Sequence, residues 1–152
     1  MCNAEEVCLV HEAIAAEFLP KLKARLTDDR AAKGAIPVEL RLDAQAQAII
    51  PGTPAEERDF DTEFLDYILA VGIVKDADAA IAHIAAHSTG HSEAVVSRNP
   101  AVLEQFAQGV DSAAVYLNCS TRFTDGGEFG LGCEMGISPR SCTRAAPWGW
   151  RS

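Results

Sequence analysis

The residues of this chain that could do chemistry include five cysteines and a set of evenly spaced histidines. The cysteines form no C-x-x-C pair and no zinc-ribbon spacing, so free thiols in a reducing compartment fit best, at least one of them reactive. A cysteine also packs well as a buried small hydrophobe, and we expect that role for Cys8, Cys119 and Cys133.

The histidines His83, His87 and His91 recur every four residues, a spacing that places metal ligands on one helix face. However, Thr89-Gly90 predicts that the helix ends before His91, and no acidic ligand is clearly placed nearby. We therefore expect no metal site here, and a histidine metal-binding module stays only as an alternative.

A glycine-rich polar stretch, residues 119–136, follows directly after the last strongly apolar segment. Ligands of open α/β sheets bind beyond the carboxyl ends of strands, so this loop is where a site is expected on physical grounds. A flexible connection is the alternative reading, because glycine-rich loops are common.

The elements that must position these residues alternate between strand and helix. Period-two or continuous apolar runs predict strands, whereas apolar residues at helical spacing and an Asn-Pro helix start predict helices. Strands are expected at 7–10, 37–42, 68–74, 92–97 and 113–118, with a weaker apolar piece at 49–50; helices at 14–26, 79–87 and 100–109; and a loop at 52–63. This order predicts an α/β fold with a mostly parallel sheet and flanking helices.

Length and charge limit the class of protein. The 152 residues are about one domain, and a net charge of -9 argues against sequence-independent binding of nucleic acid. No apolar run approaches the roughly 20 residues of a membrane helix, and the N-terminus has no signal-peptide pattern. We therefore expect a cytoplasmic location, with neither nucleic acid nor membrane as a partner.

Two segments carry a resemblance to a known family. Residues 115–134, VYLNCSTRFTDGGEFGLGCE, resemble the signature V-Y-x-N-A-S-T-R-F-T-D-G-G-x-F-G-L-G-x-E of γ-glutamyl phosphate reductases, and residues 2–11 are similar to their C-N-x-x-E-T-L-L-V-x. The resemblance covers residues 2 to about 138. It implies an incomplete aldehyde dehydrogenase-like catalytic domain, because that superfamily's N-terminal nucleotide-binding domain is not in this sequence.

This resemblance implies an NADP-dependent glutamate-5-semialdehyde dehydrogenase of proline biosynthesis. Such an enzyme reduces L-glutamyl 5-phosphate with NADPH to L-glutamate 5-semialdehyde and phosphate, through a thioester on the catalytic cysteine, which corresponds to Cys2. Glu63 and Phe64 stand where the superfamily has an element that holds the nicotinamide ribose, although a solvated loop acid is an equal reading of Glu63. A homo-oligomer is expected of the intact family.

The charge of the residues just after the last predicted strand suggests that substrate binds at the start of the glycine-rich stretch. Ser120, Thr121 and Arg122 offer hydroxyls and a bidentate cation that suit the phosphate or the α-carboxylate of the substrate, and Asp125 could pair with its α-ammonium group. Ordinary loop salt bridges are the alternative for each.

The last residues do not match the family. Deleting one base after the codon of Pro139 converts a typical family ending, P-Q-K-L-H-A-R-G-P-M-G-L-E-E, into the sequence of residues 139–152. We therefore expect a catalytic thiol domain at 1–138 and a frameshifted, non-native tail at 139–152. A catalytically inactive fragment or gene remnant, able at most to associate with other subunits, is the alternative function, and we expect the isolated chain to be inactive.

Overall fold

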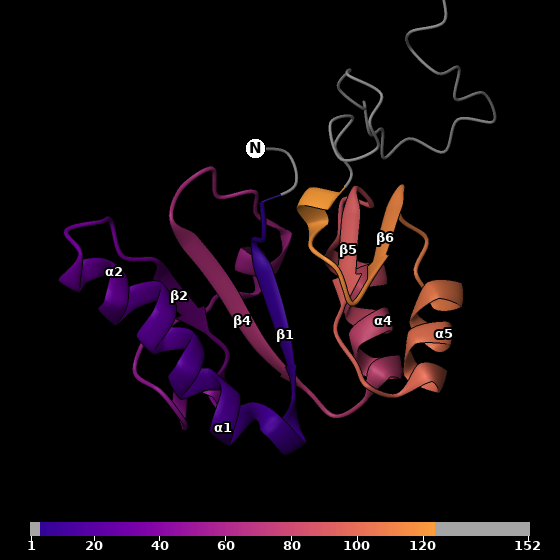
Figure 1. Cartoon of the computed structure of the whole chain (residues 1–152), viewed down its shortest axis with the longest axis horizontal. Coiled ribbons are helices and arrows are strands. Elements are labelled where there is room, and N and C mark those ends of the chain that lie inside the picture. Colours follow the sequence, from indigo (N-terminus) through magenta and orange to yellow (C-terminus); the bar gives the residue numbers. More distant parts are fainter. Residues whose placement is uncertain (1–3, 124–152) are drawn as a thin grey trace, which may run out of the picture. The chain divides into compact units, whose positions relative to one another are not determined.

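The computed structural model describes residues 4–123, and these form two units that are treated separately here (Figure 1). Residues 5–83 make up one unit, and the other begins at residue 84. Helix α4, Ala77–His87, begins in the first unit and ends in the second.

The first unit starts with a strand that leads directly into a helix, as the sequence predicts. Strand β1 spans Val7–His11 and helix α1 spans Glu12–Lys23. His11 is the N-cap, because its Nδ1 atom accepts a hydrogen bond of 3.1 Å from the Ala13 amide. A π-helical turn η1, Ala24–Asp28, and a short helix α2, Asp29–Ala32, complete the predicted helical stretch.

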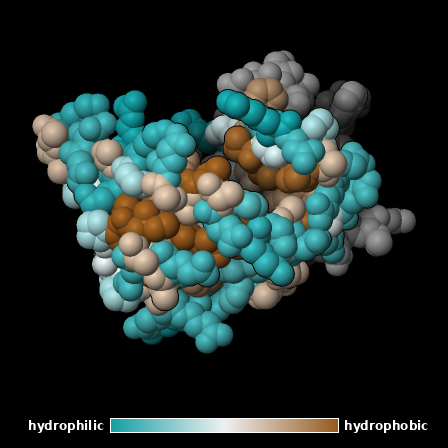
Figure 2. Space-filling view, turned by 90° about the horizontal axis from the view of Figure 1, so that it is seen from below, coloured by the Kyte–Doolittle hydropathy of each residue, from teal (hydrophilic) through white to brown (hydrophobic). Residues whose placement is uncertain are grey.

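The buried face of α1 differs from the one that the apolar spacing indicates. Ala15 and Leu19 are buried, whereas Ile14 is 54% exposed and Phe18 is 37% exposed. Leu22 and Leu26, further along the helical stretch, also pack against the core. Figure 2 shows hydrophobic residues exposed among hydrophilic ones on the face that it presents.

The sheet of the first unit has four strands in the order β1-β4-β2-β3, and every neighbouring pair is parallel. Strand β2 spans Glu39–Leu42, β3 spans Thr53–Pro54 and β4 spans Ile68–Val74. Strand β4 lies in the interior of the sheet and has four consecutive buried residues. The continuous apolar run at 68–74 therefore predicted this strand correctly.

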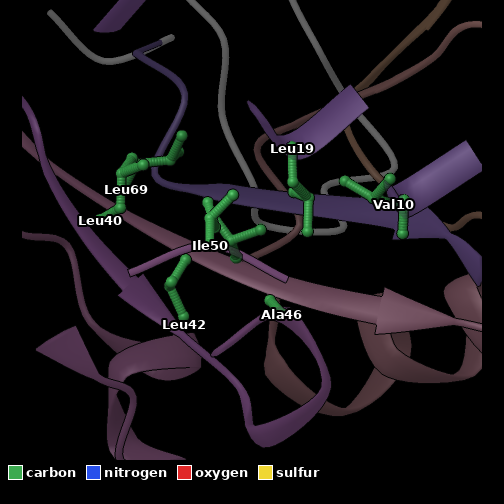
Figure 3. Close-up of a cluster of buried hydrophobic side chains, with 9 residues drawn as sticks. Val10, Leu19, Leu40, Leu42, Ala46, Ile50 and Leu69 are labelled. Carbon is green, nitrogen blue, oxygen red and sulfur yellow. The ribbon is translucent and has the colours of Figure 1, made fainter. Parts of the chain in front are cut away.

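One hydrophobic core forms against this sheet (Figure 3). Its side chains come from β1, α1, β2, β4 and the segment around α3, Ala44–Gln47. Its buried members are Val10, Ala15, Leu19, Leu40, Leu42, Ala46, Ile50, Leu69 and Val71. Ile50, expected to end a strand-like piece, lies instead in the turn after α3.

The stretch 52–63, predicted to be a loop, contains regular structure. Strand β3 and a 3₁₀ helix η2, Glu57–Asp61, lie within it. A reciprocal pair of hydrogen bonds between Glu56 and Asp59 caps η2, which the acidic and Pro-rich composition did not reveal.

The second unit repeats the strand and helix pattern. Strand β5, Ser92–Val95, pairs in parallel with β6, Ala114–Leu117, and helix α5, Pro100–Gly109, connects them. Asn99 caps α5 with Pro100 at its first position, as predicted. A single 3₁₀ turn η3, Thr121–Phe123, follows β6. Within residues 4–123, no helix is long and apolar enough to cross a membrane.

Candidate active site

The amino ends of β1 and β4 form the edge where two predicted site segments meet. Because the two strands are parallel neighbours, the residues that precede each lie at the same edge of the sheet. Val7 is in register with Ala70, and the Ala70 amide donates a 2.9 Å hydrogen bond to the backbone oxygen of Glu6. Glu6, which precedes β1, is therefore joined to β4, the strand that follows the part of the chain containing Glu63.

Glu6 holds the backbone of that part of the chain. Its Oε1 atom accepts a 3.2 Å hydrogen bond from the amide of Phe64, and the amide of Leu65 also lowers the pKa of the carboxylate. Desolvation and the charge of Glu63 raise the pKa of Glu6 above its ordinary value, and the two amides offset only part of this rise. Leu65 has φ of 53°, in the left-handed region that a leucine rarely adopts.

The ring of Phe64 is held from a different element. The guanidinium carbon of Arg41, on β2, lies 5.0 Å from the ring centroid, within cation–π distance. Arg41 donates from Nη1 to Asp59 at 2.7 Å and from Nε to Glu39 at 3.1 Å. Asp59 is 3% exposed, and its other oxygen accepts the Glu56 amide at 2.8 Å.

This arrangement fixes the charges of the Arg41–Asp59 pair. Desolvation raises the pKa of Asp59, but the Glu56 amide and the Arg41 guanidinium lower it further, so the net shift is downward. Hydrogen bonds to Asp59 and Glu39 raise the pKa of Arg41. Both groups therefore stay charged at neutral pH, and the cation remains in place beside Phe64.

Glu63 differs from its neighbours because its side chain is exposed to solvent, next to the firmly held Phe64. An exposed carboxylate can accept hydrogen bonds from two adjacent hydroxyls, as the predicted ribose contact requires. The same exposure also fits a solvated loop acid, so both interpretations of Glu63 remain. The predicted nucleophile, Cys2, lies outside the described residues.

The cysteines separate into two environments. Cys8 is partly buried against the hydrophobic core, which confirms its predicted packing role. Desolvation, the charge of Glu5 and a hydrogen bond to that carboxylate raise the pKa of the Cys8 thiol to about 12, so it stays protonated. Cys119 is exposed, so the prediction that it is buried was wrong: it follows β6, outside the hydrophobic core that residues 4–123 form. Cys133 lies outside the described residues.

The second predicted cluster follows β6 in the other unit. Asn118 has φ of 56°, and its side-chain amide makes two hydrogen bonds with the backbone of Ser97, at 2.8 and 2.9 Å. The hydroxyl oxygen of Ser120 accepts the Arg122 amide at 3.2 Å, which leaves the hydroxyl proton to donate elsewhere. Thr121 is half-buried.

Arg122 is exposed to solvent, and within residues 4–123 its guanidinium makes no salt bridge. The structure thus brings Ser120, Thr121 and Arg122 together in one turn at the carboxyl end of a strand. Asp125 lies outside the described residues.

The histidines take different positions. Helix α4 ends at His87, and His91 lies beyond it, where its Nδ1 atom contacts the Ser92 hydroxyl at 2.8 Å. His83 packs edge-on against the ring of Phe60 with 5.0 Å between centroids. Among the residues that the structure describes, no group of three acidic, histidine or cysteine side chains could hold a metal ion.

Sequence reasoning missed the supporting residues Glu6, Arg41 and Asp59. Glu6 had a detectable signal, since it aligns with the acid of the pattern C-N-x-x-E. Arg41 and Asp59 had none, because they are 18 residues apart and each is unremarkable among its sequence neighbours.

No family model matches the chain. Curated γ-glutamyl phosphate reductases do match: that of Streptococcus suis is 57% identical over 152 residues, and that of Streptococcus gordonii is 57% identical over 149 residues. These alignments cover 99% and 98% of this chain but 35% and 36% of the relatives. The chain therefore spans about a third of the length of the curated relatives that it matches.

Solved structures agree with this similarity. The crystal structure of γ-glutamyl phosphate reductase from Thermotoga maritima superposes with a TM-score of 0.85 and 46% identity, over 97% of this chain and 34% of that one. A propionaldehyde dehydrogenase from Clostridium phytofermentans has a TM-score of 0.59 at 16% identity, over 96% of this chain and 40% of that one, which shows a shared fold. The predicted mostly parallel, aldehyde dehydrogenase-like fold and the resemblance to γ-glutamyl phosphate reductases are thus confirmed.

Proposed function

We propose that this chain supplies the thiol-bearing part of a γ-glutamyl phosphate reductase. It is homologous to about a third of the length of the curated enzymes. The reaction is the NADPH-dependent reduction of L-glutamyl 5-phosphate to L-glutamate 5-semialdehyde and phosphate, a step of proline biosynthesis. The observation that supports it most is the hydrogen bond between Glu6 and Phe64, because it joins the segment after Cys2 to the predicted ribose-binding residues.

The proposed nucleophile is Cys2. Its thiolate attacks the acyl carbon, the bond from that carbon to the phosphate oxygen breaks, and phosphate leaves with the bonding electrons, so that a thioester forms. After reduction at the thioester carbonyl, the carbon–sulfur bond breaks, the aldehyde departs and the thiolate is regenerated. Cys8 is unsuited to this role, because a thiol with a pKa of about 12 has almost no thiolate at neutral pH.

NADPH, when bound, supplies the hydride of this reaction. The residues of the described chain fit such a ligand at one place: the exposed carboxylate of Glu63 can accept the two ribose hydroxyls. The adjacent Phe64 keeps a fixed backbone and a fixed ring, which restricts where that carboxylate can reach.

Arg122 is proposed to bind an anionic group of the substrate, either its phosphate or its α-carboxylate. An exposed guanidinium offers two parallel donors to such a group. The hydroxyl protons of Ser120 and Thr121 would add donors from the same turn, and Asp125 would pair with the α-ammonium group.

A hybrid reductase tests the proposed nucleophile. Residues 2–138 of this chain replace the corresponding third of the Streptococcus suis enzyme, so the tail proposed to be frameshifted is omitted. The reverse reaction is followed by formation of NADPH from glutamate-5-semialdehyde, NADP and phosphate. We expect the hybrid to be active, Cys2→Ser to abolish activity, and the exposed control Cys119→Ser to retain it.

Two results would count against the proposal. Activity that survives Cys2→Ser would remove the nucleophile from position 2. A folded hybrid without activity, beside an active parent enzyme, would instead favour the inactive-fragment reading of this chain.

The substrate contact is tested in the same hybrid. Arg122→Ala should raise KM for glutamate-5-semialdehyde about tenfold, as expected for loss of a charge-assisted hydrogen bond. Arg98→Ala is the matched control, because Arg98 is also an exposed arginine of the second unit. Equal changes in KM for the two substitutions would mean that Arg122 acts only through its charge and does not contact the substrate.

A further inference from the structure

We infer that Glu6 is a positioning residue, which holds the Glu63–Phe64 backbone so that the Glu63 carboxylate is presented to the cofactor ribose. This inference rests on the proposed function. It adds to it a residue that does not touch cofactor or substrate and acts through Glu63.

The contact itself is specific and long-range. Glu6 and Phe64 are 58 residues apart in sequence, and the carboxylate accepts the Phe64 amide at 3.2 Å while the next amide, that of Leu65, lowers its pKa. Successive amides that converge on one anion form a nest, and such a nest fixes the local path of the chain. The peptide that is held comes directly after Glu63.

The backbone at Leu65 indicates why a tether is needed here. A leucine at φ of 53° costs about 1–2 kcal/mol. Such a conformation persists only where the surroundings hold it in place. Leu65 is 81% exposed, so packing of its own side chain does not supply that restraint. The hydrogen bond from the adjacent Phe64 amide to Glu6 restrains the backbone directly before Leu65.

The Glu6 carboxylate is partly desolvated and lies near a second negative charge. Desolvation and the charge of Glu63 raise its pKa, which means that the folded state disfavours the ionised carboxylate relative to the unfolded chain. Stability from this group therefore grows as the pH falls through the raised pKa towards 4.5, and is absent at neutral pH.

The other side of Phe64 is restrained separately. Arg41 contacts the ring from β2, whereas Glu6 contacts the backbone from the start of β1. With Glu6 removed, the ring contact persists while the peptide after Glu63 is released. Loss of Glu6 should therefore misdirect Glu63 without unfolding the sheet.

The test compares Glu6→Gln with Glu5→Gln in the hybrid reductase. Glutamine keeps one oxygen for the Phe64 amide but loses the negative charge that strengthens this contact. Glu5 is a matched control, because its pKa is also raised by desolvation but its carboxylate bonds to Cys8 and not to the Phe64 backbone. We expect Glu6→Gln to raise KM for NADPH about tenfold with little change in kcat and no fall in Tm. Glu5→Gln should leave KM unchanged.

A double-mutant cycle with Glu63→Gln shows whether Glu6 acts through Glu63. Once Glu63 has lost its carboxylate, Glu6→Gln should cost nothing further. An unchanged KM for NADPH in Glu6→Gln would overturn the inference. A rise in KM that is fully additive with that of Glu63→Gln would also overturn it. The same holds for a rise in KM that is accompanied by a fall in Tm.

A second measurement separates this inference from the proposed function. Amide hydrogen exchange at residues 64 and 65 in the whole chain needs no activity. If the hybrid proves inactive, the proposed function fails, but faster exchange in Glu6→Gln than in Glu5→Gln would still support Glu6 as the residue that holds this backbone. Equal exchange in the two variants would overturn that as well.

Discussion

Replacing Asp59 by asparagine tests whether the buried Arg41–Asp59 pair stabilises the first unit. The substitution keeps the size of the side chain and an oxygen for the Glu56 amide, but removes the charge that Arg41 contacts at 2.7 Å. Breaking a buried ion pair on one side costs about 3–5 kcal/mol. Here the Arg41 side chain is 27% exposed and keeps Glu39, so we expect a loss of about 2 kcal/mol in the free energy of unfolding.

The assay is urea unfolding of the whole chain at pH 7, followed by far-UV circular dichroism. Glu57→Gln, an exposed change in the same 3₁₀ helix, is the control. Since the pKa of Asp59 is lowered, its stabilisation is present above the ordinary value of 3.8 and is lost as the pH falls below it. The difference between Asp59→Asn and the parent should therefore shrink in acid. A loss at pH 7 within about 0.5 kcal/mol of the control would refute this reasoning.

Three further predictions concern packing and reactivity. Gly52→Ala should lower the free energy of unfolding by about 1–3 kcal/mol in urea titrations, because a Cβ atom there would lie 2.6 Å from Leu42 Cδ1; a neutral effect would mean that the turn yields. Leu65→Gly should instead raise the free energy of unfolding by about 0.5–1 kcal/mol, since glycine tolerates φ of 53°. A lower free energy of unfolding would contradict the proposed backbone strain at Leu65. Alkylation by iodoacetamide, followed by peptide mass spectrometry, compares the two described cysteines. The exposed Cys119 should react readily, whereas Cys8 should react on the order of 10³ times more slowly than a thiol of pKa 9.0. Similar rates for the two thiols would contradict this expectation.

The order of elements could be predicted from the sequence because each has a strong local signal. The run at 68–74 is continuous and apolar, and Asn99-Pro100 is a helix start that needs no tertiary context. The structure of residues 52–63 could not be predicted this way. Its 3₁₀ helix depends on the buried Asp59 and on Arg41, a partner 18 residues away, and no local pattern marks that pair.

The candidate site was predictable in its residue types but not in its supports. A motif indicates Glu63 and Phe64, yet the contact between Phe64 and Glu6 arises only from the parallel pairing of β1 with β4. For Cys119, residue type alone led to a wrong prediction. Its residue type suggests burial, whereas its place after β6 leaves it exposed.

The 58 residues between Glu6 and Phe64 also set a delay during synthesis. At roughly 5–20 residues per second, the Phe64 amide is added about 3–12 s after Glu6. Strand β4 lies between β1 and β2, so before β4 emerges from the ribosome β1 cannot join the sheet and β2 can pair only with β3. Throughout that interval the Glu6 carboxylate stays hydrated, and its desolvation marks the moment at which this edge of the sheet is assembled.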